Sequence, residues 1–197
     1  MISVYQLKPR FQQLLLPILN QLHKQHITAN KITIVAIVWS AFIGVLLFMS
    51  NSHPIYLLFV AFGLLVRMAL NALDGMMARN FNQQSKLGEV LNELGDVVSD
   101  AIIFCGLFSF SYTNSMLVFL FIVLSIMNEF SGVLAKLISG TRRYDGPMGK
   151  SDRALLIGLW CLLYFIFPTI GFVFNTVLFV AIILLLISTY KRLSNSL

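Results

Sequence analysis

The stretch NALDGMMARNFNQQSKLGEVLNELGDVVSD, residues 71–100, places a dense group of carboxylates in a chain that is otherwise largely apolar. Five of the eight acidic residues lie within it: Asp74, Glu89, Glu93, Asp96 and Asp100. A central aspartate costs about 2.5–3.5 kcal/mol in a membrane, even on a lenient insertion scale. Several together therefore predict a positively charged partner and a function.

The composition around this stretch indicates an integral membrane protein. Of the 197 residues, 58% are apolar and 11% are charged, whereas ordinary soluble domains are about 45–50% apolar. The net charge of +6 is explained by membrane topology, and no soluble basic domain is present that would bind nucleic acid. Cys105 and Cys161 are isolated within apolar runs and show neither metal-ligand nor disulfide spacing.

A membrane span needs about twenty mostly apolar residues. By that measure the sequence predicts an all-α membrane fold with six spans, at about 32–50, 54–78, 88–111, 115–138, 153–168 and 170–190. Apolar residues recur at helical spacing between Leu7 and Leu22, which predicts an amphipathic helix lying in the membrane interface. Thr28 or Asn30 is available to cap the first span.

The basic residues predict the orientation. Thirteen of the fourteen Lys and Arg residues fall on one side of the predicted spans, and Arg67 within the second span is the exception. The positive-inside rule therefore places both termini and the acidic stretch at the cytoplasmic face. We expect three parts: an interfacial helix at 1–30, a six-helix membrane domain at 31–192 and a tail at 193–197.

The polar residues of the acidic stretch share helix faces. Asn71 and Asp74 are three apart in the second span. In the third, with Asn92 at zero, Asp96 falls at about 40° and Asp100 at about 80°. Oxygen ligands without His or Cys favour a hard cation, which predicts Mg²⁺, with Mn²⁺ or Ca²⁺ as alternatives.

These residues resemble the signature of the CDP-alcohol phosphotransferases, DxxDGxxAR, eight residues, then GxxxDxxxD. Here the pattern reads NALDGMMAR, eight residues, then GEVLNELGD, and the spacing matches at every position. The segment HITANKIT resembles the family's TPN segment, although Ala29 stands where Pro is usual. The expected interfacial helix and six spans extend the resemblance over most of the chain.

The resemblance implies a metal-dependent enzyme of phospholipid biosynthesis. It would transfer a phosphatidyl group from CDP-diacylglycerol, or a related group from another CDP-alcohol, to the hydroxyl of a small acceptor, releasing CMP. In the family the first three aspartates bind divalent metals, the third is shared between them, and the fourth is the proposed general base. The resemblance also implies a homodimer in a membrane, which we expect to be the bacterial inner membrane.

Carried over by position, the resemblance assigns three groups of residues. Asp96 is the expected base, and the metal ligands are Asn71, Asp74, Asn92 and Asp96. The CDP-binding residues are Gly75, Ala78, Arg79 and Gly88, with Asn30 as a further candidate. A second basic cluster, SGTRRYDGPMGKSDRALL, fits the segment by which the family binds its acceptor, and its candidates are Lys150 and Arg153, with Arg142 and Arg143 beside them.

The match departs from the family at Asn71 and Asn92, which stand where aspartates are expected. An amide oxygen can still ligate a hard cation, but it contributes no charge. We expect Asp100 to supply part of the missing charge, with Glu93 or Glu89 as alternatives. Arg67 and Glu129, the remaining charges within spans, are expected to pair with each other.

Other functions remain as alternatives. A degenerate member would bind nucleotide or lipid without turnover, and a hydrolase would use water as the acceptor. A transporter is disfavoured because the second and third spans are polar mainly at their cytoplasmic ends, whereas a conduit needs polar residues across the membrane.

Overall fold

The structure is a computed structural model that describes residues 4–110 and 112–197, with side chains described from Pro9 onward. The described chain is helical throughout its regular elements. Seven α-helices and two 3-10 helices follow one another: α1 Val4–Lys24, α2 Ala29–Met49, α3 Tyr56–Asn80, α4 Lys86–Cys105, η1 Gly106–Ser109, α5 Ser115–Ser139, α6 Lys150–Ile166, η2 Pro168–Val173 and α7 Phe174–Ser194.

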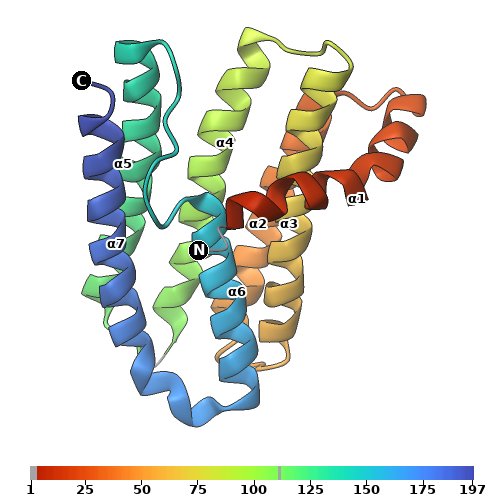
Figure 1. The fold of residues 1–197 in the computed structure, drawn as a ribbon. Coiled ribbons are helices and arrows are strands. Elements are labelled where there is room, and N and C mark those ends of the chain that lie inside the picture. Colours follow the sequence, from red (N-terminus) through yellow and green to blue (C-terminus); the bar gives the residue numbers. More distant parts are fainter. Residues whose placement is uncertain (1–3, 111) are drawn as a thin grey trace.

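Helix α1 runs across the bundle formed by the other helices (Figure 1). Its buried Leu15 and Leu19 pack with Leu73, Met76 and Met77 of α3. The following turn ends at Thr28, whose hydroxyl accepts a hydrogen bond from the Lys31 amide at 3.4 Å and caps α2. The predicted amphipathic helix and cap are thus present, and α1 lies against the last turns of α3.

Helix α2 holds the two helices of the acidic stretch in place. It packs along both α3 and α4, and glycines allow the close approach. A Cβ added to Gly44 would lie 2.9 Å from Ile102, and one added to Gly106 would lie 2.8 Å from Leu47. Beyond α4, α5 packs against α4 and α7, while α6 packs against α3. The ends of α3, α4 and α6 therefore surround one polar region.

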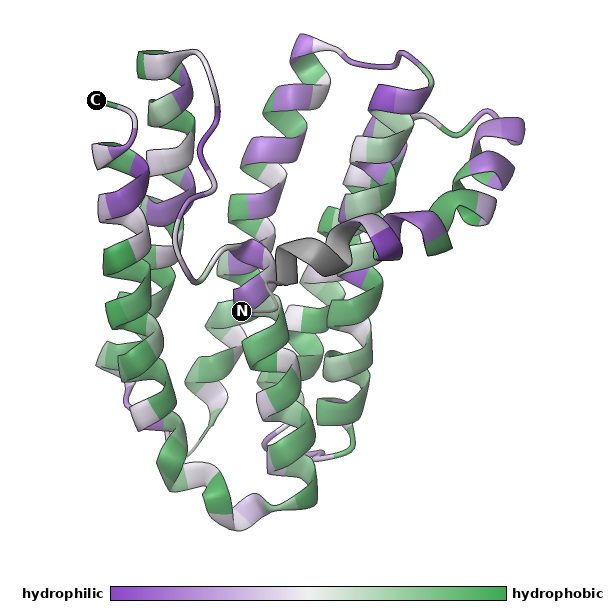
Figure 2. Ribbon diagram, viewed as in Figure 1, coloured by the Kyte–Doolittle hydropathy of each residue, from purple (hydrophilic) through white to green (hydrophobic). Residues whose placement is uncertain are grey.

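Hydrophilic residues gather toward one end of the bundle, and the helices are mostly hydrophobic below it (Figure 2). Four stretches of the described chain are long and apolar enough to cross a membrane: Ala29–Met49, Tyr56–Asn80, Ser115–Ser139 and Pro168–Ser194. Many large apolar side chains on them are exposed, including Phe42, Phe62 and Phe179. Exposed apolar surface of this extent is typical of lipid contact, and the chain is an integral membrane protein.

Helices α4 and α6 coincide with two further predicted spans but are not among these four. Both carry several charged residues at the polar end, and α6 has 17 residues. Helix α4 is thus set apart by its charged residues, and α6 by its shorter length.

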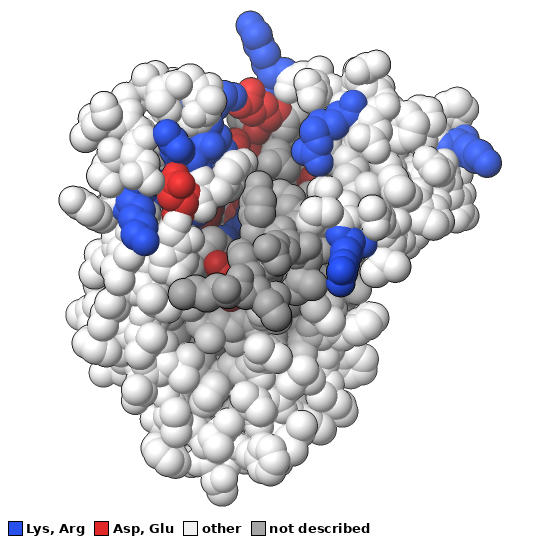
Figure 3. Space-filling view, in the orientation of Figure 1, with Lys and Arg blue, Asp and Glu red and all other residues white. Residues whose placement is uncertain are grey.

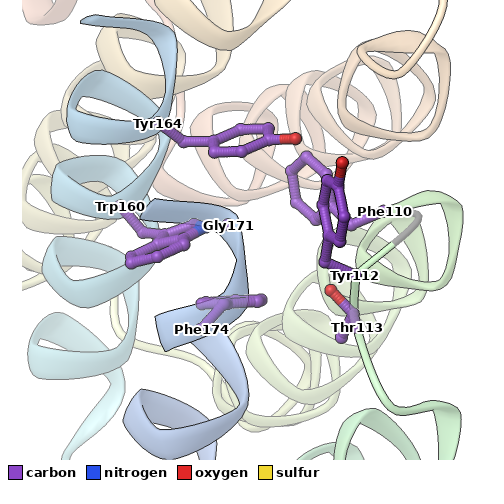
Figure 4. Close-up of a pocket in the computed structure, with 7 residues that line it drawn as sticks. All are labelled: Phe110, Tyr112, Thr113, Trp160, Tyr164, Gly171 and Phe174. Atoms are coloured by element: carbon purple, nitrogen blue, oxygen red, sulfur yellow. The ribbon is translucent and has the colours of Figure 1, made fainter. Parts of the chain in front are cut away.

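At the opposite end of the bundle, aromatic residues enclose a small apolar cavity (Figure 4). The rings of Trp160 and Phe174 stack with centroids 4.5 Å apart, and Tyr112 and Tyr164 lie beside Gly171. None of its seven lining residues is charged. This cavity offers no group for acid-base or phosphate chemistry, so the candidate site lies at the polar end.

Candidate active site

The four motif positions meet between α3 and α4. The Asn71 amide donates a hydrogen bond to Asp96 Oδ1 at 2.9 Å, and the Asn92 amide donates to Asp74 Oδ2 at 3.3 Å. Each helix thus contributes one amide and one carboxylate, and each amide faces the other helix's carboxylate. The spacing predicted that these residues share two helix faces, and the structure brings those faces together.

Asp74 has one oxygen that is bound and one that is free. Its Oδ2 accepts hydrogen bonds from the Thr33 hydroxyl at 3.0 Å and from Asn92. Its Oδ1 is buried and has no hydrogen-bond partner among the described residues. The side chain is only 3% exposed. A buried carboxylate oxygen without a partner is costly, which indicates a position where a cation binds.

Asp96 differs from Asp74 because both of its oxygens have partners. Oδ1 receives the Asn71 amide, and a guanidinium nitrogen of Arg67 lies 4.0 Å away. Oδ2 forms an ion pair with the Lys150 ammonium group at the start of α6. Lys150, predicted to contact an acceptor, therefore lies beside the predicted base.

The small residues of the motif permit close contacts at the polar end. A Cβ added to Gly75 would lie 3.2 Å from the Arg79 guanidinium, and one added to Gly88 would lie 2.8 Å from Asn30 Oδ1. Ala78 is half-buried on the same face. The predicted CDP-binding residues thus form two neighbouring groups, one on α3 and one where the beginnings of α2 and α4 meet.

Arg79 is exposed and borders a groove of about 240 Å³ between α1 and the end of α3. Gln12, Gln13 and Asn80 also line this groove and offer hydrogen-bonding groups. On the surface, Lys and Arg side chains surround the acidic residues at the polar end, and the opposite end is uncharged in this view (Figure 3). Such a rim attracts an anionic ligand.

One turn further along α4, Asp100 is held by two guanidinium groups. Arg67 lies 2.7 Å from its Oδ1, and Arg153 donates to its Oδ2 through Nε at 3.1 Å and Nη2 at 2.7 Å. These contacts balance the charge of Asp100, and its expected place in a metal shell with Asp96 stays a prediction. Arg153 has 0% exposure, and its expected contact with the acceptor also stays a prediction.

Glu129 of α5 is the second centre of this buried ion-pair network. It accepts from Arg153 at 2.9 Å and from Arg142 at 2.8 Å, and Arg192 lies 3.8 Å away. The predicted pairing of Arg67 with Glu129 is therefore wrong. Arg67 of α3 pairs instead with Asp100 of α4, and Glu129 of α5 pairs with Arg142 and Arg153.

The loop after α5 is tied to the same network. Arg142 contacts Glu93 of α4 at 2.6 Å as well as Glu129. Burial lowers the pKa of the Arg142 guanidinium, but Tyr144 and the two carboxylates raise it by more, so this group stays charged. Glu93 Oε1 is thus paired with Arg142, while its Oε2 is buried without a hydrogen-bond partner among the described residues. Its role as a metal ligand stays a prediction.

Arg143 points away from the carboxylates of the motif. Its Nη2 donates to the Asn195 carbonyl after α7 at 2.8 Å. Arg142 and Arg143, two adjacent candidates for acceptor contact, are thus both engaged elsewhere. Of the predicted acceptor-binding residues, Lys150 alone contacts a carboxylate of the motif.

The residues present fit one hard divalent cation. Two carboxylates and two amides supply only oxygen ligands once each amide presents its oxygen, and Asp74 already has an unpartnered one. No group of three or more His, Cys, Asp or Glu side chains suited to a metal occurs among the described residues. Mg²⁺ typically uses one or two carboxylates together with substrate phosphates, which agrees with this small set.

Two site residues were missed from the sequence. Thr33 contacts Asp74 from the first turns of α2, and Arg67 lies beside Asp96. Arg67 carried a signal, since a charge within a span marks a functional or paired position. A threonine within a span carries no such signal, because its hydroxyl often donates a hydrogen bond to a carbonyl of its own helix. Thr33 also makes this bond, to the Ala29 carbonyl at 3.2 Å.

Comparison with known proteins connects this geometry to a family. A model of the family described as CDP-alcohol phosphatidyltransferase matches residues 26–191. A protein of Escherichia coli named inner membrane protein YnbA is 48% identical over 166 residues, covering 84% of this chain and 82% of that protein. An uncharacterized protein of Aquifex aeolicus is 29% identical over 172 residues, covering 81% of this chain and 84% of its own.

Solved structures share the fold. The phosphatidylinositol phosphate synthase of Mycobacterium tuberculosis with CDP-DAG bound superimposes with a TM-score of 0.75 at 21% identity, covering 91% of this chain and 92% of that one. The same synthase in complex with manganese and citrate gives a TM-score of 0.75 at 21% identity, covering 91% and 87%. At this identity the likeness establishes the arrangement of helices.

Proposed function

The chain belongs to the CDP-alcohol phosphatidyltransferase family, and on that premise we propose that it transfers a phosphatidyl group from CDP-diacylglycerol to an acceptor hydroxyl, releasing CMP. The observation that carries this proposal is the meeting of Asp74 and Asp96 across α3 and α4, with an amide beside each and a free oxygen on Asp74. The solved relative with CDP-DAG bound supports this class of substrate.

The CDP part of the substrate would bind beside Gly75, Ala78, Arg79, Gly88 and Asn30. Arg79 is exposed and free to turn toward a diphosphate, and charge-assisted bonds from arginine to phosphate are strong. The glycines leave room because no Cβ intervenes near Arg79 and Asn30. The same residues would recognise another CDP-alcohol, since none of them is specific for a diacylglycerol.

Asp96 is the proposed general base. The acceptor hydroxyl would give its proton to an Asp96 oxygen while its own oxygen forms a bond to the phosphatidyl phosphorus, and the bond from that phosphorus to CMP would break. Lys150 adjoins Asp96 and marks the side from which the acceptor enters. A phosphorylated acceptor would gain a charge-assisted bond from its ammonium group.

Asn71, Asp74, Asn92 and Asp96 are the residues proposed to hold the divalent metal, Mg²⁺ or Mn²⁺. When bound, such an ion neutralises the diphosphate and stabilises the departing CMP. The relative crystallised with manganese supports a divalent ion. Within the described residues, Asp74 provides the unpartnered buried oxygen on which the ion would be centred.

The proposal includes six spans, formed by α2 to α7, with both termini and the site at the cytoplasmic face of an inner membrane. The basic rim at the polar end and the apolar belt support this orientation. The name of the Escherichia coli relative supports an inner membrane location. A homodimer also remains a proposal carried from the family resemblance.

Cysteine labelling tests the orientation. In a chain with Cys105 and Cys161 replaced by alanine, Gln84→Cys marks the loop between α3 and α4, and Ser52→Cys marks the loop between α2 and α3. We expect a membrane-impermeant maleimide to label Ser52→Cys in intact spheroplasts and Gln84→Cys only after lysis. The reverse pattern would contradict the cytoplasmic placement of the site.

The reaction itself is tested by CMP release. Purified protein is incubated with CDP-diacylglycerol, Mg²⁺ or Mn²⁺, and a panel of alcohols that includes glycerol 3-phosphate, inositol, inositol phosphate and serine. We expect metal-dependent CMP release with at least one acceptor and little without any. Release that is equal with and without acceptors would indicate a hydrolase, and no release with any of them would favour binding without turnover.

A further inference from the structure

The two carboxylates of the site are in different electrostatic surroundings. The hydrogen bonds to Asp74 Oδ2 come from uncharged groups, the Thr33 hydroxyl and the Asn92 amide, and its buried Oδ1 has no hydrogen-bond partner among the described residues. Asp96 has the Lys150 ammonium group on Oδ2, and the Arg67 guanidinium lies 4.0 Å from Oδ1. One aspartate therefore has an oxygen open to a cation, whereas the other is already paired with the Lys150 ammonium group.

We propose that the Lys150 ammonium group takes the place of a second metal ion, so that the chain holds a single divalent cation centred on Asp74. This inference rests on the proposed function, because it describes how the same site balances the charge of its substrate. It departs from the expectation, drawn from the family resemblance, that one aspartate is shared between metals.

The substitutions at Asn71 and Asn92 agree with this arrangement. An aspartate at position 71 would place a second negative charge beside Asp96, whose Oδ1 is 2.9 Å from the present amide nitrogen. With Asn71 in place, Lys150 alone balances Asp96. A second divalent ion at Asp96 would be opposed by the ammonium group already there.

The charge of the substrate also favours a single divalent ion. A diphosphate diester brings two negative charges to the site. Asp74 and Asp96 supply two more. One divalent ion, Lys150 and Arg79 balance these four charges. Arg67 is not available for this purpose, since Asp100 holds it at 2.7 Å. A second divalent ion would leave the site with excess positive charge.

Manganese binding measures directly how many divalent ions each chain holds. Purified chain in detergent is titrated with Mn²⁺ while electron paramagnetic resonance reports free ion, and the bound spectrum is checked for spin coupling between neighbouring ions. We expect one Mn²⁺ per chain at saturation, without coupling, and none for Asp74→Asn. Two bound ions in the unmodified chain would overturn the proposal, whatever the variants do.

Paired variants isolate the part played by Lys150. Asn71→Asp alone should still bind one Mn²⁺, because Lys150 remains, whereas Asn71→Asp with Lys150→Met should bind two. The matched control combines Asn71→Asp with Lys86→Met, an exposed lysine at the start of α4, and should bind one. Two ions in Asn71→Asp alone, or one in the Lys150 double variant with unchanged helicity, would contradict the proposal.

This experiment tests the number of bound metal ions separately from the phosphatidyl-transfer reaction. Binding needs no turnover, so an active chain with two coupled ions would refute the single-ion proposal and leave phosphatidyl transfer standing. A chain that binds one ion but releases no CMP with any acceptor would refute phosphatidyl transfer and leave the single-ion proposal standing.

Discussion

Asp96→Asn is expected to lower CMP release from CDP-diacylglycerol by about 10² to 10⁴-fold, the usual contribution of a positioned general base. Asparagine keeps the size of this buried side chain and one of its two acceptor oxygens, but it does not take up the proton of the acceptor hydroxyl. Its neighbours Asn71 and Lys150 stay in reach. Initial rates at saturating acceptor and Mg²⁺ give the effect on kcat.

Two further measurements show that this loss is chemical. Mn²⁺ binding by Asp96→Asn should be retained, although weakened, because the ion is proposed to centre on Asp74 and an amide oxygen at position 96 can still ligate it. The control Asp152→Asn alters another carboxylate of the same region, whose Oδ2 accepts from the Gly149 amide at 3.0 Å and caps α6. Asparagine also caps helices well, so this variant should keep nearly full activity. Equal rates in Asp96→Asn and the unmodified chain would exclude the base.

Arg153→Met is expected to lower the free energy of unfolding by about 3–5 kcal/mol, the usual cost of removing one partner from a buried ion pair. The Arg153 guanidinium bonds Asp100, Glu129 and the Met148 carbonyl at 3.0 Å and has no exposed surface. Methionine fills similar apolar volume but leaves those groups without their shared cation. Unfolding in mixed micelles, followed by circular dichroism, measures the change.

A matched control uses an exposed pair. Lys136 pairs with Glu89, and the two side chains are 45% and 53% exposed. Lys136→Met should cost less than about 1 kcal/mol, because solvent screens such pairs. If both methionine variants unfolded alike, the buried network would not be the main connection between α4, α5 and α6.

The helices and their order along the chain could be predicted well from the sequence. Apolar segment length placed the six predicted segments over helices α2 to α7, and the crossing of the membrane by all six stays a prediction. Thr28 was recognised as a cap by residue type. These features are local, so hydrophobicity and capping chemistry are sufficient to find them.

The ion-pair partners of the buried charged residues farther from the polar end could not be predicted from such local features. The stripe on α4 placed Asp100 near Asp96 in angle, but four residues also advance the helix axis by about 6 Å. At that depth Asp100 meets Arg67 and Arg153. The error at Arg67 and Glu129 has a related cause, because the sequence does not show which helices are neighbours around the bundle.

The site was predictable where the motif spacing defined it. Asn71, Asp74, Asn92 and Asp96 were expected on two facing helices, and they meet there. Lys150 was expected to contact the acceptor, whereas its ion pair with Asp96 could not be derived from spacing, since α6 follows much later in the chain. That contact changes the charge of the site, and it led to the proposal of a single metal ion.

Identification of the lipid product tests the central claim most directly. Purified chain, CDP-diacylglycerol and Mg²⁺ are incubated with the acceptor panel, CMP is quantified, and the lipids are identified by mass. Phosphatidyl transfer predicts one phosphatidylated alcohol for each CMP released, and loss of both products in Asp96→Asn. Phosphatidic acid as the sole lipid product, or no CMP with any acceptor, would contradict the account.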